Sequence, residues 1–488
     1  MRRKLCSKVV CEQTAESVRL LDTRTQFHVE LAGIDEDLHQ TALLSEAVAN
    51  FVDPLGFLDE DIPIGILRAK QRPWRKQLAD LHRDAVLTAF VRRLKETVPY
   101  YRNNGRGLEA ESDLRLPHAP RLSKADLRVH WADLLDPEVN LADGLTDGSL
   151  EIAQTSGSSG ERLRVVAQLR SDHLPPCPEQ VWGIAPLPEA IRVAVITSPN
   201  CTVRYCGLVS AVREDRLINQ TTLQIAGSHD IFHADDSFVR QVAEDLQSFR
   251  ADILVANPVY LDWLTVRAKG LGLHLPSVSL VLTTYQYTPT LQRLAIETAW
   301  KAPVYDIYSA TECGGLEVAV GCRCGNWHVF ENHSFVEIEP SKTAGLPHEV
   351  GDVLVTTHAS EVMPLFRYEI GDLAAWSDID CECPLSDWRT LVFHGRSQET
   401  LRVGYRCVTT RQVDNVVAKI KGIAFAQVYA RNNEYCAEVV PSESGSFKAS
   451  ELREAFSEEI GIASLRVREV RALRPLPSLK YPLVRPVA

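Results

Sequence analysis

Short apolar runs alternate with amphipathic stretches between about residues 190 and 310. Three apolar runs have the length and β-branched content of buried strands: 192–197, 252–257 and 278–284. The stretches that follow carry apolar residues at helical spacing: 237–249, 260–271 and 290–300. Because strands that alternate with helices usually run parallel, this region predicts an α/β domain with a mostly parallel sheet flanked by helices.

Patterns on both sides extend this prediction. Upstream, apolar residues at helical spacing predict a helix within 73–98, whereas residues 1–50 are mixed, partly helical and poorly defined. Ser123, followed by Asp126 three positions later, is typical of a capping box at the start of a short helix. Downstream, 335–340 and 351–359 resemble strands.

The C-terminal part of the chain has a different pattern. A helix, two strands and a second helix predict a small α+β module: 412–422, 423–431, 435–441 and 449–461. We therefore expect a large N-terminal domain over 1–396 and a small mobile C-terminal domain over 397–488. Within the large domain, residues 1–70 form a poorly defined N-terminal extension.

Composition narrows the classes of function. A chain of 488 residues exceeds one ordinary core, so two or more domains are expected. The net charge of −11 argues against nonspecific nucleic-acid binding. No apolar run approaches the ~18 residues that span a bilayer, and the basic N-terminus lacks the apolar core of a signal peptide. We expect a cytoplasmic protein with no membrane or nucleic-acid partner.

A loop rich in glycine and hydroxyl residues separates two strand-like stretches, 150–154 and 163–168. Glycines allow close backbone approach, and hydroxyl groups beside exposed N–H groups suit an anion. It is not a Walker loop, because no Gly-Lys-Ser/Thr follows. From the residues alone, a phosphate-binding loop, a hairpin turn and a linker all stay open. The loop consists of Thr155, Ser156, Gly157, Ser158, Ser159 and Gly160.

Three stretches follow this loop in order: VYDIYSATECGG (304–315), LFRYEIGDLAAW (365–376) and HGRSQETLRVGYRCV (394–408). Together with the loop, they resemble the motifs of the adenylate-forming enzymes, the superfamily of acyl-CoA synthetases and related ligases. Within it, they are similar to the phenylacetate-CoA ligase-like branch. The resemblance runs from about residue 75 to the end. It implies a large adenylate-forming domain and a small C-terminal domain that rotates between two half-reactions.

The resemblance also implies roles for individual residues. The loop 155–160 would hold the β- and γ-phosphates of ATP, and Glu312 would hold Mg²⁺, which favours carboxylate oxygen. Lys480 would bridge the carboxylate of the acid and the α-phosphate, offsetting the charge that builds there. The remaining implied nucleotide contacts are Tyr308 on adenine, Thr311 on the α-phosphate, and Asp372 and Arg396 on the ribose. Asp372 is predicted to lie in a Gly371-Asp372 turn that follows a strand.

Several positions depart from the branch. Gln398, the implied hinge, and Glu399 stand where the branch usually has two aspartates. The pair Ser478-Leu479 precedes Lys480 in place of two glycines, and TTYQYTP (283–289) replaces a small-residue turn with a glutamate. Because that turn lies against adenine in relatives, these departures leave adenylation better supported than the identity of the acceptor.

Five residues around the Asp372 motif have the side chains of a metal site. Thiolates and imidazole suit tetrahedral zinc, and some members of the resembled branch carry a structural zinc in this region. The candidates are Cys322, Cys324, His328, Cys381 and Cys383. Five groups exceed four positions, so one is spare, and Cys322 or Cys324 is favoured as the spare one. Coincidental reduced thiols are the alternative.

Three functions stay open. The leading hypothesis is an ATP-dependent ligase that adenylates an aromatic or cyclic carboxylic acid and transfers the acyl group to CoA, with ATP, Mg²⁺ and structural Zn²⁺ as cofactors. The second keeps adenylation but uses an amine or carrier-protein thiol as acceptor, or activates an oxyanion such as nitrite for N–N bond formation. The third is a non-catalytic nucleotide-binding protein. A homodimer is also left open.

The implied role of Lys480 leads to a direct test. We expect Lys480→Ala to abolish adenylation, because no other cation would replace the ammonium group between carboxylate and α-phosphate. Acid-dependent exchange of pyrophosphate into ATP measures the loss, and circular dichroism checks that the variant folds. Full activity in the variant would remove the assignment.

Overall fold

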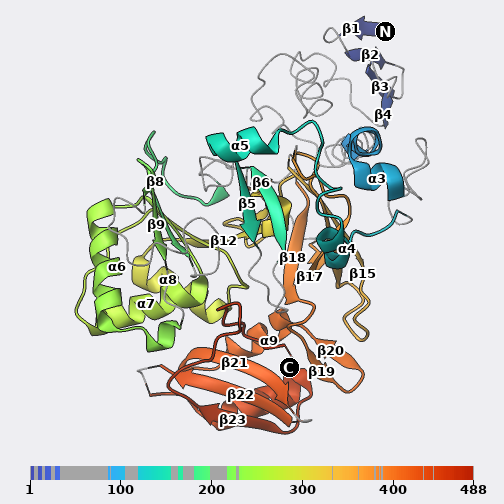
Figure 1. The fold of residues 1–488 in the computed structure, drawn as a ribbon. Coiled ribbons are helices and arrows are strands. Elements are labelled where there is room, and N and C mark those ends of the chain that lie inside the picture. Colours follow the sequence, from blue (N-terminus) through green and yellow to red (C-terminus); the bar gives the residue numbers. More distant parts are fainter. Residues whose placement is uncertain are drawn as a thin grey trace.

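The computed structural model describes most residues after 118 and shorter segments before them. The described residues are 2–4, 9–13, 17–22, 28–32, 86–87, 90–104, 119–154, 163–168, 181–197, 217–226, 230–331, 333–360, 362–377, 381–383, 385, 388–431, 434–442 and 445–486. Figure 1 shows a large part built around one long sheet and, at the bottom of the view, a smaller C-terminal part in orange and red.

Twelve described strands form one sheet, in the order β15-β16-β17-β18-β14-β13-β12-β11-β10-β7-β9-β8. Its parallel portion consists of β9 (Thr222–Ala226), β7 (Val193–Thr197), β10 (Ile253–Ala256), β11 (Leu280–Thr283) and β12 (Val304–Ser309). The short strand β8 (Leu217–Asn219) lies antiparallel to β9 at the edge. The three strands predicted between residues 190 and 310 are confirmed.

Three helices connect or follow the parallel strands, as predicted: α6 (Asp236–Phe249), α7 (Pro258–Gly270) and α8 (Thr290–Trp300). Their apolar side chains and those of the strands form a shared buried cluster. Helix α7 begins at a proline, and Asn257 caps it by accepting hydrogen bonds from the backbone N–H groups of Val259 (3.0 Å) and Tyr260 (3.2 Å).

The other half of the sheet runs antiparallel. Its strands are β13 (Glu317–Gly321), β14 (Trp327–Val329), β15 (Phe335–Pro340), β16 (Gly351–Thr356), β17 (Tyr368–Trp376) and β18 (Thr390–Arg396). Short connections such as 322–326 allow only hairpins, because a parallel crossover needs a dozen residues or more. The α/β class is confirmed, as are the strands predicted at 335–340 and 351–359, and the sheet as a whole is mixed.

The C-terminal residues form the predicted α+β elements. They are the hairpin β19 (Leu401–Val403) and β20 (Arg406–Val408), α9 (Thr410–Val417), β21 (Ile423–Arg431), β22 (Glu434–Pro441), α10 (Ala449–Ala455), a π-helical turn Phe456–Ile460, and β23 (Leu465–Glu469). Thr409 caps α9 in a capping box with Gln412. The division of the chain at 396/397 stays a prediction.

Buried polar contacts join this C-terminal part to the large part. The carboxylate of Asp414 on α9 accepts hydrogen bonds from the Tyr287 hydroxyl (3.0 Å) and from the Thr290 hydroxyl (2.8 Å). Gln292 on α8 donates to the backbone oxygen of Ala424 on β21 at 2.7 Å. Because buried polar groups need partners, these contacts specify how the two parts meet.

The N-terminal region differs from its prediction. Four strands, β1 (Arg2–Lys4), β2 (Val9–Gln13), β3 (Ser17–Asp22) and β4 (His28–Ala32), form a separate antiparallel sheet. The described part of residues 1–50 holds no helix. Within 73–98, residues 86–87 and 90–97 are helical. The helices that follow are α3 (Pro99–Asn104), α4 (Lys124–Val129) and α5 (Leu141–Asp147).

Strands β5 (Leu150–Gln154) and β6 (Arg164–Gln168) pair antiparallel, with Gln154 opposite Arg164. They stand at the two ends of the predicted phosphate loop. Thr155 to Gly160 lie outside the described residues, so the role of this loop stays a prediction. None of the described helices has the length and apolar content needed to cross a bilayer.

Candidate functional site

The candidate site begins where the sheet changes from parallel to antiparallel. Strand β12 pairs parallel with β11 on one side and antiparallel with β13 on the other, and its register shifts between Tyr308 and Ser309. A 3₁₀ turn, Thr311–Cys313, follows directly. Ligands of α/β sheets usually bind beyond the carboxyl ends of strands at such a topological break. This places the YSATE motif at the position where a site is expected.

Asp372 joins three strands at this point. The sequence suggested a turn after a strand, but Asp372 lies inside β17, because Gly371 adopts a φ of 86° that lets the strand continue through a register shift opposite β16. The Asp372 carboxylate is 7% exposed. It accepts hydrogen bonds from the Tyr308 hydroxyl (2.8 Å) and from Arg396 Nε (3.1 Å).

Tyr308 is a buried hydrogen-bond donor within an aromatic group. Its ring lies 5.2 Å from Phe393 and 6.2 Å from Trp327 between centroids. Burial, together with the neighbouring Asp372 carboxylate, raises the pKa of Tyr308 well above its ordinary value. The hydroxyl therefore stays protonated at neutral pH and donates a hydrogen bond to Asp372.

Glu312 has partners that the sequence did not reveal. Its carboxylate is buried and accepts a hydrogen bond from the Tyr368 hydroxyl at 3.1 Å, and Lys124 Nζ lies 3.7 Å from the same oxygen. Tyr368 lies in the stretch 365–376 that carries the family resemblance, so the sequence did single out the region of this residue. Lys124 follows Ser123, whose predicted capping box with Asp126 is confirmed, and only the fold brings this lysine to Glu312.

Lys480, in the C-terminal part, interacts electrostatically with the Glu399 carboxylate. Its positive charge and that of Arg396 lower the pKa of Glu399, whereas the negative charge of Asp372 raises it. Burial has the larger, opposite effect and raises the pKa of Glu399 to about 7. The fold therefore gathers Arg396, Lys480, Asp372 and Glu399 into one electrostatic group. Gln398, the predicted hinge, lies exposed in the turn after β18.

A turn holds the backbone of Lys480. The backbone N–H of Leu476 donates to the Lys480 oxygen at 2.8 Å, and the N–H of Leu479 donates to the Leu476 oxygen at 2.8 Å. Leu479 adopts a φ of 61°, the left-handed conformation that favours glycine. The resembled branch usually has a glycine at this position, which adopts such a φ without strain, whereas here a leucine adopts it.

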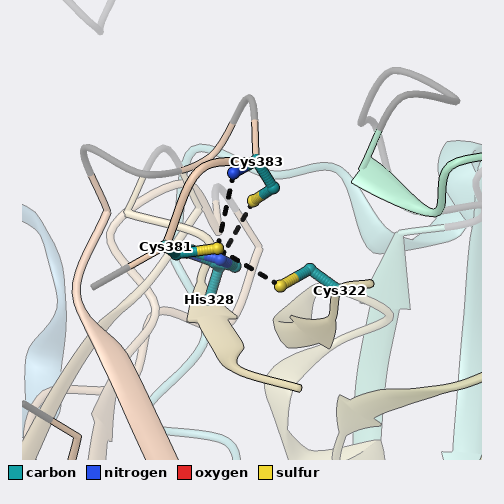
Figure 2. A group of neighbouring side chains, drawn as sticks. All are labelled: Cys322, His328, Cys381 and Cys383. Atoms are coloured by element: carbon teal, nitrogen blue, oxygen red, sulfur yellow. Dashed lines mark hydrogen bonds between the residues drawn. The ribbon is translucent and has the colours of Figure 1, made fainter. Parts of the chain in front are cut away.

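Four buried metal-ligand side chains lie together in Figure 2: Cys322, His328, Cys381 and Cys383. Their ligand atoms all lie within 4.8 Å of one another. The sulfur atoms of Cys322 and Cys381 are 3.5 Å apart, and Cys383 Sγ is 3.1 Å from His328 Nε2. Cys322 follows β13, His328 lies on β14, and the other two cysteines lie between β17 and β18. Cys324 is exposed and lies outside the group.

The electrostatics of this cysteine–histidine cluster favour a thiolate. A hydrogen bond with Cys383 and the neighbouring His328 lower the pKa of the Cys322 thiol, whereas the hydrogen bond with Cys322 and burial raise the pKa of the Cys383 thiol. Of the two thiols, Cys322 is therefore the one that loses its proton more readily. Thiolates and a neutral imidazole are the donors of structural zinc sites, so the cluster fits that ion.

Comparisons with known proteins agree with this geometry. The chain is similar in fold to 2-hydroxyisobutyryl-CoA ligase in the postadenylation state in complex with R3-HIB-AMP, with a TM-score of 0.61 and 16% identity over 86% of this chain and 92% of the other. The complex of that ligase with 2-HIB-AMP gives a TM-score of 0.58 at the same identity and coverage. At such low identity, the likeness concerns the fold.

Curated relatives supply the sequence link, although no family model matches the chain. A phenylacetate-coenzyme A ligase of Thermus thermophilus is 26% identical over 254 residues, which cover 50% of this chain and 54% of the relative. That of Aromatoleum evansii is 29% identical over 134 residues, or 26% and 30% of the two chains. These alignments make the chain similar in sequence to phenylacetate-coenzyme A ligases, and the structural matches show that it shares the fold of an acyl-CoA ligase. The alignments span about half of the first relative and less than a third of the second.

The raised pKa of Glu399 leads to a prediction about stability. We expect Glu399→Gln to stabilise the chain at pH 8 and to have a much smaller effect at pH 5. The unfolded glutamate releases its proton near 4.5 and the folded one near 7, so the folded state loses stability as pH rises through that window. A shift of this size corresponds to about 3 kcal/mol. Denaturant unfolding at both pH values measures it.

The natural chain provides the reference for this measurement. Burial raises the pKa of Asp262 to about 7 as well, but that group titrates in both proteins and cancels in their difference. An equal stability difference at pH 5 and pH 8 would contradict the buried-acid assignment of Glu399.

Proposed function

We propose that the protein is an ATP-dependent ligase that adenylates an aromatic or cyclic carboxylic acid and then transfers the acyl group to CoA. The observation that carries this proposal is the meeting of Tyr308, Asp372 and Arg396 at the sheet break. The charges of Glu312 and Lys480 belong to the same electrostatic neighbourhood. The printed names of the curated relatives, phenylacetate-coenzyme A ligases, agree with it.

The chemistry explains why these residue types are needed. A carboxylate is a poor acylating agent, so its oxygen attacks the α-phosphorus of ATP, and the bond to the β-phosphate oxygen breaks. Pyrophosphate leaves, and the resulting acyl-AMP carries a good leaving group. The protein contributes mainly by holding the two anions together and by stabilising charge. In this proposal, Lys480 places its ammonium group between the carboxylate and the α-phosphate, while Thr311 contacts that phosphate.

Asp372 is well suited to bind ribose. Its two oxygens each accept one hydrogen bond from the protein, from Tyr308 and from Arg396, and each retains a lone pair for a ribose hydroxyl. Glu312 would hold Mg²⁺ through its carboxylate, and the ion would neutralise phosphate charge when bound. We propose that Lys124, beside Glu312, adds a second cation for the phosphates.

A second candidate function keeps adenylation and changes the partners. The acceptor would be an amine or a carrier-protein thiol, or the activated group would be an oxyanion such as nitrite in N–N bond formation. The unusual 283–289 stretch favours this candidate. Tyr285 there has a φ of 76°, and Gln286 bonds to Tyr481 in the C-terminal part, so this stretch differs from the turn that relatives place against adenine.

The decisive test is acid-dependent exchange of pyrophosphate into ATP. We expect exchange with one class among a panel of aromatic, cyclic and aliphatic acids and oxyanions, because adenylation is reversible before the acceptor enters. Mass spectrometry of products with and without CoA then separates the two candidate functions. ATP binding without exchange for any member of the panel would support a non-catalytic nucleotide-binding protein instead.

We also propose that Cys322, His328, Cys381 and Cys383 hold one structural zinc ion. The burial of all four, their mutual approach and the thiolate character of Cys322 support it. When bound, the ion would supply a cross-link between the segment after β13 and the segment that follows β17, both near Asp372. Closed four-donor sites leave no open position for catalysis.

The zinc proposal predicts metal content. We expect freshly purified protein to contain about one zinc per chain, because four protein donors complete a tetrahedral site. Cys383→Ser is expected to lower that content strongly, and its thermal midpoint is expected to fall by several degrees, because structural zinc contributes folding free energy. Elemental analysis and thermal unfolding are the measurements.

Cys324→Ser is the matched control for this experiment. It removes a thiol that neighbours Cys381 but is exposed and is not one of the four proposed ligands, so metal content should be unchanged. Freshly purified natural protein without zinc would overturn the proposal.

A further inference from the structure

The carboxamide of Gln286 forms two hydrogen bonds with the backbone of Tyr481, the residue that follows Lys480. Its Oε1 accepts from the Tyr481 N–H at 3.1 Å, and its Nε2 donates to the Tyr481 backbone oxygen at 3.2 Å. A primary amide that pairs with both groups of one residue fixes position and rotation together. The two residues are 195 positions apart in the chain.

One of these bonds also holds the peptide plane between Lys480 and Tyr481. The Tyr481 N–H that Gln286 binds belongs to the Lys480–Tyr481 peptide, and the Lys480 oxygen of the same peptide accepts from the Leu476 N–H at 2.8 Å. Both polar groups of that peptide are therefore occupied. As a result, the point from which the lysine side chain departs is held on two sides.

Asn257 orients the glutamine. Asn257 is completely buried, and its Oδ1 is used in capping α7. Its Nδ2 donates to Gln286 Oε1 at 3.2 Å, which selects the amide orientation that presents Nε2 to the Tyr481 oxygen. The N-terminus of α7, through its cap Asn257, thus holds Gln286 in the orientation that binds Tyr481.

The Tyr481 side chain anchors the same residue in the core. It is 1% exposed, and its hydroxyl donates to Asp230 Oδ1 (2.8 Å) and accepts from the Ile231 N–H (3.2 Å). Its ring packs edge-on against Phe232 and Tyr260. Backbone and side chain of Tyr481 are therefore both held by the large part, on the C-terminal side of Lys480.

Backbone strain accompanies both halves of the contact. Tyr285, before the glutamine, and Leu479, before the lysine, each have a positive φ. A non-glycine residue in that region is strained and persists only where its surroundings impose it. The bonds between Gln286 and Tyr481 are part of those surroundings.

We propose that Gln286 is a positioning residue for Lys480, which holds the lysine backbone so that its ammonium group reaches the reacting carboxylate and α-phosphate. This proposal rests on the proposed adenylation function and assigns a role to the stretch that departs most from the resembled branch. Gln286 acts through Lys480 and touches neither nucleotide nor acid. The alternative is that it contacts adenine, as that part of the chain does in relatives.

Gln286→Leu tests the assignment by separating kcat from KM. We expect kcat for acid-dependent pyrophosphate exchange to fall by about 10- to 100-fold, because misplacing a catalytic group by an ångström has effects of that order. The KM values for ATP and acid should change less than about twofold, since binding alone does not need the lysine in place. Gln286→Glu retains the acceptor, loses the donor and should show a smaller fall in kcat.

Gln292→Leu is the matched control. Gln292 also bridges the large part to the C-terminal part, but its partner there is the Ala424 oxygen on β21 instead of the backbone of Tyr481. It should lower thermal stability without the selective fall in kcat. An equal fall in kcat for this control would show that general loosening of the contact is sufficient, and would overturn the assignment.

A double variant tests whether Gln286 acts through Lys480. Because Lys480→Ala is expected to remove measurable exchange, the comparison uses the slow residual formation of acyl-AMP in single turnovers with enzyme in excess, and adding Gln286→Leu should lower that rate by less than about twofold, because residues that act as a unit are not additive. The same fold loss in both backgrounds, or a raised KM for ATP with unchanged kcat, would assign Gln286 an independent role at adenine.

Hydrogen exchange provides a readout that does not need activity. The Tyr481 amide should be protected in the natural chain and should lose protection in Gln286→Leu, with the amides of β16 and β17, which do not contact Gln286, unchanged as the folding control. Unchanged protection would overturn the positioning role. If the natural chain shows no exchange of pyrophosphate, the proposed function fails, while the amide measurement still decides whether Gln286 holds the Lys480 segment.

Discussion

The buried carboxylate of Asp372 is the interaction on which the candidate site depends. An ionised group out of water is unfavourable by several kcal/mol unless it is paired and hydrogen-bonded. Arg396 on β18 supplies the charge, and Tyr308 on β12 supplies a second donor. Asp372 and Arg396 are direct partners across β17 and β18. Because a slip of one residue would turn the side chains to opposite faces, strand register is part of the site.

Charge balance around Asp372 follows from the same burial. Arg396 and Lys480 are cations near the Glu399 carboxylate, and Asp372 forms an ion pair with Arg396. Because burial raises the pKa of Glu399 to about 7, this group is about half protonated at neutral pH and adds less negative charge than an ordinary glutamate would. The glutamate that departs from the family pattern therefore has a physical consequence.

Most elements could be predicted because each left a local pattern. The strand at 335–340 and the alternation of strands and helices up to residue 300 followed from apolar periodicity. The contact of Lys124 with Glu312 and that of Gln286 with Tyr481 could not be predicted, since they depend on residues 188 and 195 positions apart that only the fold unites. From the Cys-x-Cys spacing, Cys322 and Cys324 were equally good candidates for the metal cluster. The structure distinguishes them, because Cys322 is buried and Cys324 is exposed. Asp372 was misplaced into a turn because a positive φ inside a strand has no sequence signal beyond a glycine.

The anchoring of Tyr481 also bears on how the chain folds during synthesis. The ring fills space between Phe232 and Tyr260, and its hydroxyl bonds to a residue 251 positions earlier. The cluster around α6 and α7 is therefore complete only after the ribosome has made residue 481. Contacts of such long sequence separation form slowly, and apolar surface stays exposed meanwhile. The cluster around α6 and α7 therefore stays incomplete in the nascent chain until the segment that contains Lys480 and Tyr481 has been made.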